Sequence, residues 1–288
     1  MDVYCFSRVR HFKDSNFLHW FSQELIHELV ARNILDQIKP DLILHLAGIH
    51  GPAGTLDNLS RTVREDMKSV HVKLTQVLIN WCEQNPRTKM IVSLTSKMYR
   101  PSSLISIINS DSEINPMNYY GETKAQAYEI IKKAQNSGLL VNGAILFTHT
   151  SPYSKDGFLL FQVAKELLLV KDGIKKHIDV YNGEELLDIS DARDICLAIG
   201  EIARLDAPIN TVIGSGRVVK IEEIIRSVFS DLTIEEVPVH SRNYSPTLMV
   251  KSDQREMKEK IPDWLGSRNI SSTLLDIVEY LRNGIRYF

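Results

Sequence analysis

The chain has 288 residues, of which 43% are hydrophobic and 24% charged, and this is enough to bury a sizeable core. A formal net charge of −2 argues against broad electrostatic attraction to nucleic acid or to an anionic membrane. Cys5, Cys82 and Cys196 show no CxxC motif or histidine-linked metal spacing, so we expect no disulfide, no metal site and a reducing compartment. No apolar run reaches the roughly 18 residues of a membrane span, and residues 1–8 lack a signal-peptide core, which predicts a cytoplasmic protein.

Apolar runs alternate with helical patterns along the first half of the chain. We expect strands at 1–8, 41–48, 89–94 and 139–147, and helices at about 16–38 and 59–84, with a third opened by Tyr120. Continuous apolar strands that alternate with helices indicate a parallel sheet covered on both faces. The sequence therefore predicts an α/β fold with a doubly wound parallel sheet.

Three residues form a candidate catalytic set. Tyr120 and Lys124 are four residues apart, so on a helix they share one face. A nearby ammonium favours the phenolate, so Lys124 is predicted to lower the pKa of Tyr120 and make it a usable general base. Thr95, at the end of the third strand, is expected to hydrogen-bond the same substrate oxygen.

The chain resembles a known family over nearly its whole length. Residues 39–48 are similar to the "KPDxVxHLAA" strand of the extended short-chain dehydrogenase/reductases that modify nucleotide sugars. Thr95 falls on the active-site Ser/Thr of that family, and Tyr120 with Lys124 on its YxxxK pair. Residues 148–153, followed by Phe158, resemble the "NHESPRR...NF" stretch of GDP-mannose 4,6-dehydratases.

The resemblance implies a Rossmann-like enzyme that depends on NAD(P) and acts on a nucleotide sugar in polysaccharide synthesis. It further implies cofactor-binding residues, namely Ser7, Arg8, Leu46, Ala47, Gly48 and Lys124. It implies substrate-binding residues as well, namely Lys97, Thr148, Ser151, Phe158 and Arg242. No carboxylate follows the first strand to bind the ribose of NAD, and Arg8 is suited to an added phosphate, so NADP is expected over NAD.

The family organisation predicts how the chain is divided. Residues 1–150 are expected to form the dinucleotide-binding core, completed by about 178–213, while 151–177 and 214–288 form the substrate-binding region. Family enzymes dimerise through a helix bundle, which implies a homodimer through about 59–84 and 120–135. No glycine-rich phosphate-binding turn precedes Asp41, so residues 3–8 resemble the second strand of the family, and we expect the first βα unit to be missing.

Lys97 is the main departure from the dehydratase pattern. The 4,6-dehydratases carry a glutamate two residues after the active-site threonine, whereas this chain has Lys97 there. A charged lysine cannot accept a proton, so the sequence favours a C4 epimerase or a ketosugar reductase. The alternatives are a cofactor-free binding or regulatory relative and an N-terminally truncated product of a 4,6-dehydratase or epimerase.

Overall fold

The computed structural model describes residues 2–6, 18–21, 27–50, 58–242, 248–264, 266 and 268–283. At its centre is a parallel four-stranded sheet in the order β11-β6-β4-β3. These strands are β3 (Leu42–His45), β4 (Lys89–Thr95), β6 (Val141–Leu146) and β11 (Asn210–Ile213). Buried apolar side chains fill β4 and β6, as a sheet covered on both faces requires. The predicted doubly wound α/β fold is confirmed.

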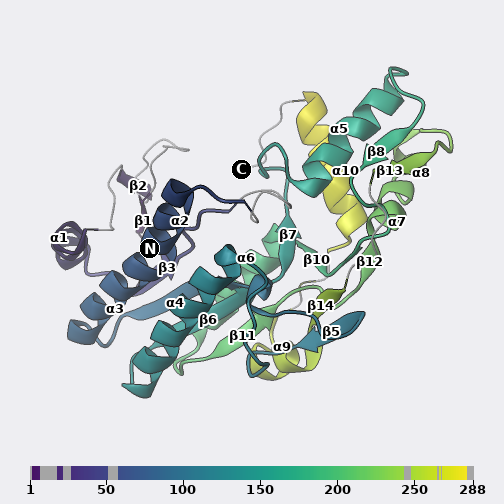
Figure 1. Cartoon of the computed structure of the whole chain (residues 1–288). Helices are drawn as coiled ribbons and strands as arrows, with labels where there is room; N and C mark the ends of the chain where they lie inside the picture. Colours follow the sequence, from purple (N-terminus) through teal and green to yellow (C-terminus); the bar gives the residue numbers. More distant parts are fainter. Residues whose placement is uncertain are drawn as a thin grey trace.

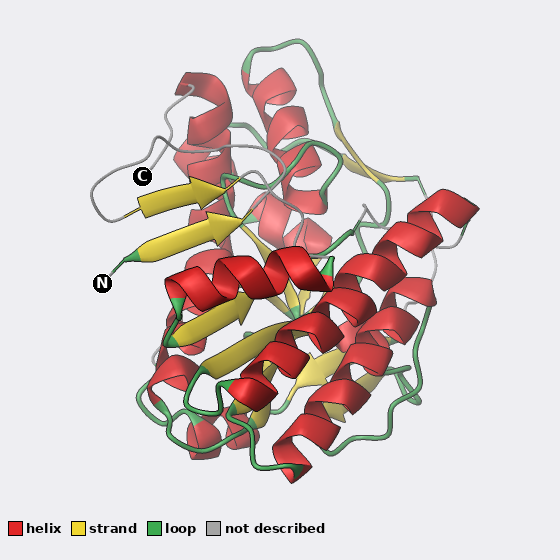
Figure 2. Cartoon of the chain, turned by 90° about the vertical axis from the view of Figure 1, so that its left-hand side faces the viewer, coloured by secondary structure: helices red, strands yellow, loops and turns green. Residues whose placement is uncertain are grey.

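Helices flank this sheet and follow the predicted order. The expected helix at 59–84 is helical throughout, as α2 (Arg61–Lys68), a π-helical turn (Ser69–Lys73) and α3 (Leu74–Gln84). The helix α4 (Tyr119–Asn136) lies beside α3 and packs on β4 and β6 (Figures 1 and 2). The helix α6 (Ala192–Arg204) also packs on β4 and β6. Together these elements surround one large hydrophobic core.

A second hydrophobic cluster holds the remaining part of the chain. It is built around α5, α7 and α10, with β8 and β13 beside them, and lies to the right in Figure 1. The further elements are β5 (Ile105–Ile108), β7 (Thr148–Thr150), α5 (Leu159–Lys171), β8 (Ile178–Val180), β9 (Leu186–Leu187), β10 (Ile189–Asp191), β12 (Val219–Lys220), α7 (Ile221–Arg226), α8 (Phe229–Leu232), β13 (Val239–Ser241), β14 (Met249–Ser252), α9 (Gln254–Lys260) and α10 (Ile270–Asn283). None of the helices in the described part of the chain has the length and apolar character to cross a bilayer.

The predicted helix at about 16–38 is wrong at Leu18–Phe21. The structure has a strand, β2 (Leu18–Phe21), paired in parallel with β1 (Val3–Phe6), and the helix α1 begins only at Glu28 and ends at Ile38. The sequence Leu-His-Trp-Phe is rich in aromatic residues, which favour strands, so local propensity and pairing with β1 outweigh the helical periodicity.

The side chain of Glu256, in α9, connects three parts of the chain by hydrogen bonds. Its buried carboxylate accepts hydrogen bonds from the amide and hydroxyl of Ser110, the amide of Val212 and the ammonium of Lys260. Burial alone would raise the pKa of Glu256, but these donors outweigh it and lower the pKa.

We expect Glu256→Ala to lower the free energy of unfolding by about 3 kcal/mol, because three elements lose a shared acceptor. Chemical denaturation should show a change below about 0.5 kcal/mol for Glu259→Ala, an exposed position on the same helix.

Candidate active site

The three predicted catalytic residues come from two neighbouring elements. Thr95 is the last residue of β4, and Tyr120 and Lys124 lie in the first two turns of α4. The Asn118 side chain caps this helix by accepting a hydrogen bond from the amide of Gly121 at 3.0 Å. A capped helix that begins beside the end of β4 therefore directs Tyr120 and Lys124 toward Thr95.

Gly121 allows the helix to approach the strand end this closely. A Cβ atom built on Gly121 would collide with the backbone carbonyl of Lys97, which belongs to the short 3₁₀ turn Ser96–Met98 after β4. The Lys97 carbonyl also accepts a hydrogen bond from the amide of Met117, at 3.0 Å. The contact thus fixes α4 against the turn that follows Thr95.

Tyr120 has the environment of a protonated phenol. Burial raises its pKa to about 12, and a hydrogen bond with the Thr95 side chain opposes that rise only in part. The Tyr120 ring meets two imidazoles edge to face, His50 with centroids 4.7 Å apart and His71 at 5.4 Å. The predicted lowering of the Tyr120 pKa by Lys124 is therefore wrong, because burial dominates.

Lys124 is the most deeply buried cation of the site. Its side chain is 2% exposed, and the ammonium donates to the carbonyl of Ser93 at 2.7 Å and lies 3.4 Å from the Ser93 hydroxyl. Burial lowers the pKa of Lys124 to about 7. A lysine that is only partly charged at neutral pH explains why it does not stabilise the phenolate of Tyr120 here.

His71 connects the loop after β3 to the catalytic helix. The amide of Ile49 donates to Nε2 of His71 at 3.0 Å, so the ring proton is on Nδ1, which donates to the Thr123 hydroxyl at 2.8 Å. That hydroxyl donates in turn to the backbone carbonyl of Tyr120. Because the chain of hydrogen bonds ends on a backbone carbonyl and not on the phenol, His71 positions the helix and relays no proton to Tyr120. Burial, with smaller effects from Lys124 and the neighbouring histidines, lowers the pKa of His71 to about 2.

The predicted cofactor-binding residues of β3 lie next to this group. Leu46, Ala47 and Gly48 follow the end of β3 and are exposed. A Cβ atom on Gly48 would lie 3.5 Å from Nε2 of His71 and 3.9 Å from Nζ of Lys124. The end of β3 and the catalytic helix therefore meet at this point. Ser7 and Arg8 lie outside the described residues.

Three of the predicted substrate-binding residues lie on β7 or between β7 and α5. Phe158 stacks on His50, with centroids 5.8 Å apart, and His50 in turn contacts Tyr120, so Phe158 lies one ring away from the catalytic tyrosine. Thr148 is exposed on β7, and the half-buried Ser151 accepts from the amide of Tyr153.

Lys97 and Arg242 lie on different elements. Lys97 is half-buried on the turn after β4, where its charge contributes to lowering the pKa of His50. Arg242 follows β13, with its side chain 70% exposed and 3.8 Å from Asp179. It thus lies beside the strands β8 and β13 and not on the turn of Lys97.

A family model now identifies the chain. The model described as GDP-mannose 4,6 dehydratase matches residues 4–264. The chain belongs to this family. The sequence-based recognition of nucleotide-sugar dehydratases and epimerases is thereby confirmed.

Curated relatives of the GDP-mannose 4,6-dehydratase family are distant in sequence. The GDP-mannose 4,6-dehydratase of Yersinia enterocolitica is 23% identical over 251 residues, which cover 86% of this chain and 66% of that protein. The enzyme of the same name from Vibrio cholerae is 24% identical over 229 residues, 78% of this chain and 60% of its own length. The chain thus spans less than two thirds of the length of these relatives.

Solved structures share the fold. The dTDP-glucose 4,6-dehydratase of Bacillus anthracis, in complex with NAD, superposes with a TM-score of 0.81 at 15% identity, over 98% of this chain and 88% of that one. The UDP-glucose 4-epimerase of Thermotoga maritima, with UDP-glucose, gives 0.78 at 17% identity, over 98% and 91%. RMD from Pseudomonas aeruginosa, complexed with NADPH, gives 0.75 at 18% identity, over 91% and 89%.

Sequence reasoning missed two residues of this family site. His50 lies just after the predicted strand at 41–48, and nothing in its neighbours along the chain indicates that it would contact both Tyr120 and Phe158. Ser93 was read as part of a buried strand, although its carbonyl holds the Lys124 ammonium. Its position two residues before Thr95, on the same side of β4, was the available signal.

Proposed function

We propose that this chain is a nucleotide-sugar oxidoreductase that works with a nicotinamide cofactor, of the C4-epimerase or ketosugar-reductase type. The observation that carries the proposal is the convergence of Thr95, Tyr120 and Lys124 at one strand end, inside a shell of neutral histidines. Burial keeps the pKa of His45 at about 3 and that of His71 at about 2, so both imidazoles are neutral at physiological pH.

In this proposal the cofactor accepts or supplies a hydride, and the protein moves the proton. Tyr120 exchanges its proton with the oxygen on the reacting carbon, and Thr95 holds that same oxygen by a hydrogen bond. Lys124 holds the nicotinamide ribose. Burial keeps the Tyr120 phenol protonated at neutral pH, so it holds the proton that the oxygen of a ketosugar must receive on reduction.

Lys97 supports epimerase or reductase chemistry over dehydration. Elimination of water needs a group that removes a proton from the carbon next to the ketone, and a protonated lysine cannot do so. The position two residues after Thr95 carries Lys97, half-buried on the turn that α4 packs against. We propose that Lys97 binds substrate instead, together with Thr148, Ser151 and Phe158.

The remaining parts of the proposal follow the family. Arg242 contacts the diphosphate of the nucleotide sugar, which its planar guanidinium can bind in a bidentate way. Residues 1–150 with about 178–213 bind the cofactor, and 151–177 with 214–288 bind the substrate. The protein acts in the cytoplasm as a homodimer through the helices α3 and α4.

A titration of the purified protein with NADP+ and, separately, NAD+ tests the proposal. We expect NADP+ to bind in the micromolar range and more tightly than NAD+, because Arg8 replaces the carboxylate that selects NAD. The measurement is calorimetric heat or quenching of tryptophan fluorescence. Arg8→Ala should weaken NADP+ binding by about tenfold and leave NAD+ binding unchanged.

The matching substrate assay uses nucleotide-linked 4-ketosugars and hexoses with the bound cofactor. Turnover of a ketosugar to a hydroxyl sugar, or inversion at C4, supports the proposal. Absence of binding up to millimolar concentrations of both cofactors contradicts it and leaves a cofactor-free sugar-nucleotide-binding protein.

A further inference from the structure

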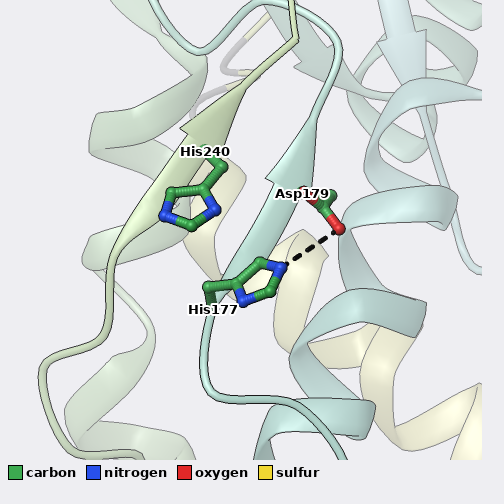
Figure 3. Close-up of side chains that lie close together, drawn as sticks. All are labelled: His177, Asp179 and His240. Carbon is green, nitrogen blue, oxygen red and sulfur yellow. Dashed lines mark ion pairs between the residues drawn. The ribbon is translucent and has the colours of Figure 1, made fainter.

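Three metal-ligating side chains meet on the neighbouring strands β8 and β13, outside the active site. His177 precedes β8, and the parallel register places Asp179 of β8 opposite His240 of β13. Because side chains alternate between the faces of a strand, His177, Asp179 and His240 share one face. Ile178 and Val180 take the opposite face and enter the hydrophobic cluster. Figure 3 shows the two imidazoles side by side with the carboxylate next to them.

The distances within this group are close to those of a metal site. Nε2 of His177 is 3.5 Å from Oδ2 of Asp179, and the rings of His177 and His240 stack with centroids 4.4 Å apart. One ligand atom from each of the three residues lies within 4.8 Å of the other two. In a tetrahedral site with bonds of about 2.0–2.1 Å, ligand atoms are roughly 3.4 Å apart. His177 is half-exposed and His240 is exposed, so neither imidazole is fixed by core packing, and the proposed site requires both rings to rotate toward that spacing.

We propose that His177, Asp179 and His240 form a binding site for a divalent transition-metal ion such as Zn²⁺. Two imidazoles with one carboxylate select zinc, cobalt or nickel over magnesium and calcium, which prefer oxygen ligands throughout. Three protein ligands leave a coordination position open to water or to an oxygen of a bound molecule.

The charges around the site permit a bound cation. Lys175 donates to Asp179 at 2.9 Å, but it also donates to Glu166 at 2.6 Å, so its charge is already offset. Lys175 and Arg242 both approach Oδ2 of Asp179, which is also the oxygen near His177, so a metal would bind through the remaining lone pairs of this carboxylate while it accepts from Lys175. Arg242 lies 3.8 Å from Asp179 and is largely exposed, so solvent screens its charge.

The metal would act as a clamp between two short strands. The strands β8 and β13 have three residues each, and His240 belongs to the strand that leads directly to Arg242. A metal that ties His240 to the β8 side therefore fixes the start of the segment that carries Arg242. This site does not depend on the proposed oxidoreductase function.

Zinc titration of the tag-free, metal-stripped full chain tests the site. We expect one Zn²⁺ per chain by calorimetry, and a rise of about 5 °C in Tm at a zinc concentration about 100 times the Kd. His240→Gln and His177→Gln should each lower zinc affinity by at least about 100-fold, since loss of an outer-shell partner alone costs about 10- to 100-fold. His27→Gln, an exposed histidine at the start of α1, is the matched control and should bind zinc as the unchanged protein does.

Co²⁺ binding to the unchanged chain tests the site independently of whether the variants fold. Co²⁺ bound by two imidazoles and a carboxylate in the unchanged chain should give visible d–d absorption that one equivalent of Zn²⁺ removes. The proposal is overturned if the unchanged chain takes up no zinc at tenfold excess. It is equally overturned if His240→Gln and His177→Gln keep the affinity of the His27→Gln control.

Discussion

Tyr120→Phe is expected to lower kcat by about 10²- to 10⁴-fold, with cofactor affinity unchanged, because the substitution removes the proton that Tyr120 exchanges with the substrate oxygen. Tyr120 is half-buried at the start of α4, where its hydroxyl hydrogen-bonds the Thr95 side chain and its ring contacts His50 and His71, so Tyr120→Phe keeps the ring contacts. Stability should change by only about 1 kcal/mol. Steady-state turnover of the ketosugar found in the substrate assay, with a parallel cofactor titration, measures both quantities.

Tyr119→Phe is the matched control for this experiment. Tyr119 precedes Tyr120 on the same helix, but its hydroxyl donates to the backbone carbonyl of Arg64, away from Thr95. We expect its kcat to stay within about twofold of the unchanged protein, as for a surface substitution outside the site. Equal turnover by Tyr120→Phe and Tyr119→Phe would show that the phenol takes no part in catalysis.

The convergence of Thr95, Tyr120 and Lys124 was predictable because it depends on local rules. Residues i and i+4 share a helix face in any fold, and Thr95 ends an apolar strand, so the sequence alone indicates that Tyr120, Lys124 and Thr95 converge. The alternation of strands and helices likewise gave the parallel sheet. The family model then confirmed the resemblance seen in the motifs.

The wrong predictions concern features that depend on contacts between residues far apart in the sequence. Periodicity predicted a helix from about residue 16, but pairing of Leu18–Phe21 with β1 makes a strand there. Sequence spacing suggested that Lys124 lowers the pKa of Tyr120, whereas burial of both groups raises one pKa and lowers the other. The depth of a side chain in the core is set by the whole fold, and no motif encodes it.

The site on β8 and β13 was missed for a similar reason. His177 and Asp179 are two residues apart, which alone is a common pattern on a strand. His240 joins them only through the parallel pairing of two short strands that are distant in the chain. Strand pairing over such a separation cannot be read from spacing, so the sequence predicted no metal site.

Lys124→Met is expected to abolish turnover and yet to stabilise the folded protein at neutral pH. Burial lowers the pKa of Lys124 from 10.5 to about 7, which corresponds to about 5 kcal/mol of unfavourable interaction with the charged form. Methionine has a similar shape and no charge to desolvate. The carbonyl of Ser93 loses its donor, at a cost of about 1–3 kcal/mol, so the net gain in unfolding free energy at pH 7 should be about 2–4 kcal/mol.

The stability gained by Lys124→Met should depend on pH. Below about pH 7 both the folded and the unfolded chain hold the Lys124 proton, so the cost of burial is constant. Between pH 7 and 10.5 the unfolded chain keeps the proton and the folded chain releases it, so the free energy of unfolding contributed by Lys124 rises with pH. The advantage of Lys124→Met should therefore shrink from pH 7 to 9.5, where only about 1.4 kcal/mol of the cost remains.

Urea unfolding of both proteins at pH 6.5, 8 and 9.5 measures this difference. Lys133→Met, at an exposed position of the same helix, serves as the control and should show a difference that does not vary with pH. A Lys124→Met protein that is less stable than the unchanged chain at every pH would mean that the ammonium is charged and well solvated inside the fold. The lysine would then be available to stabilise the Tyr120 phenolate before any cofactor binds, and the site would act as a base without help from the ligand.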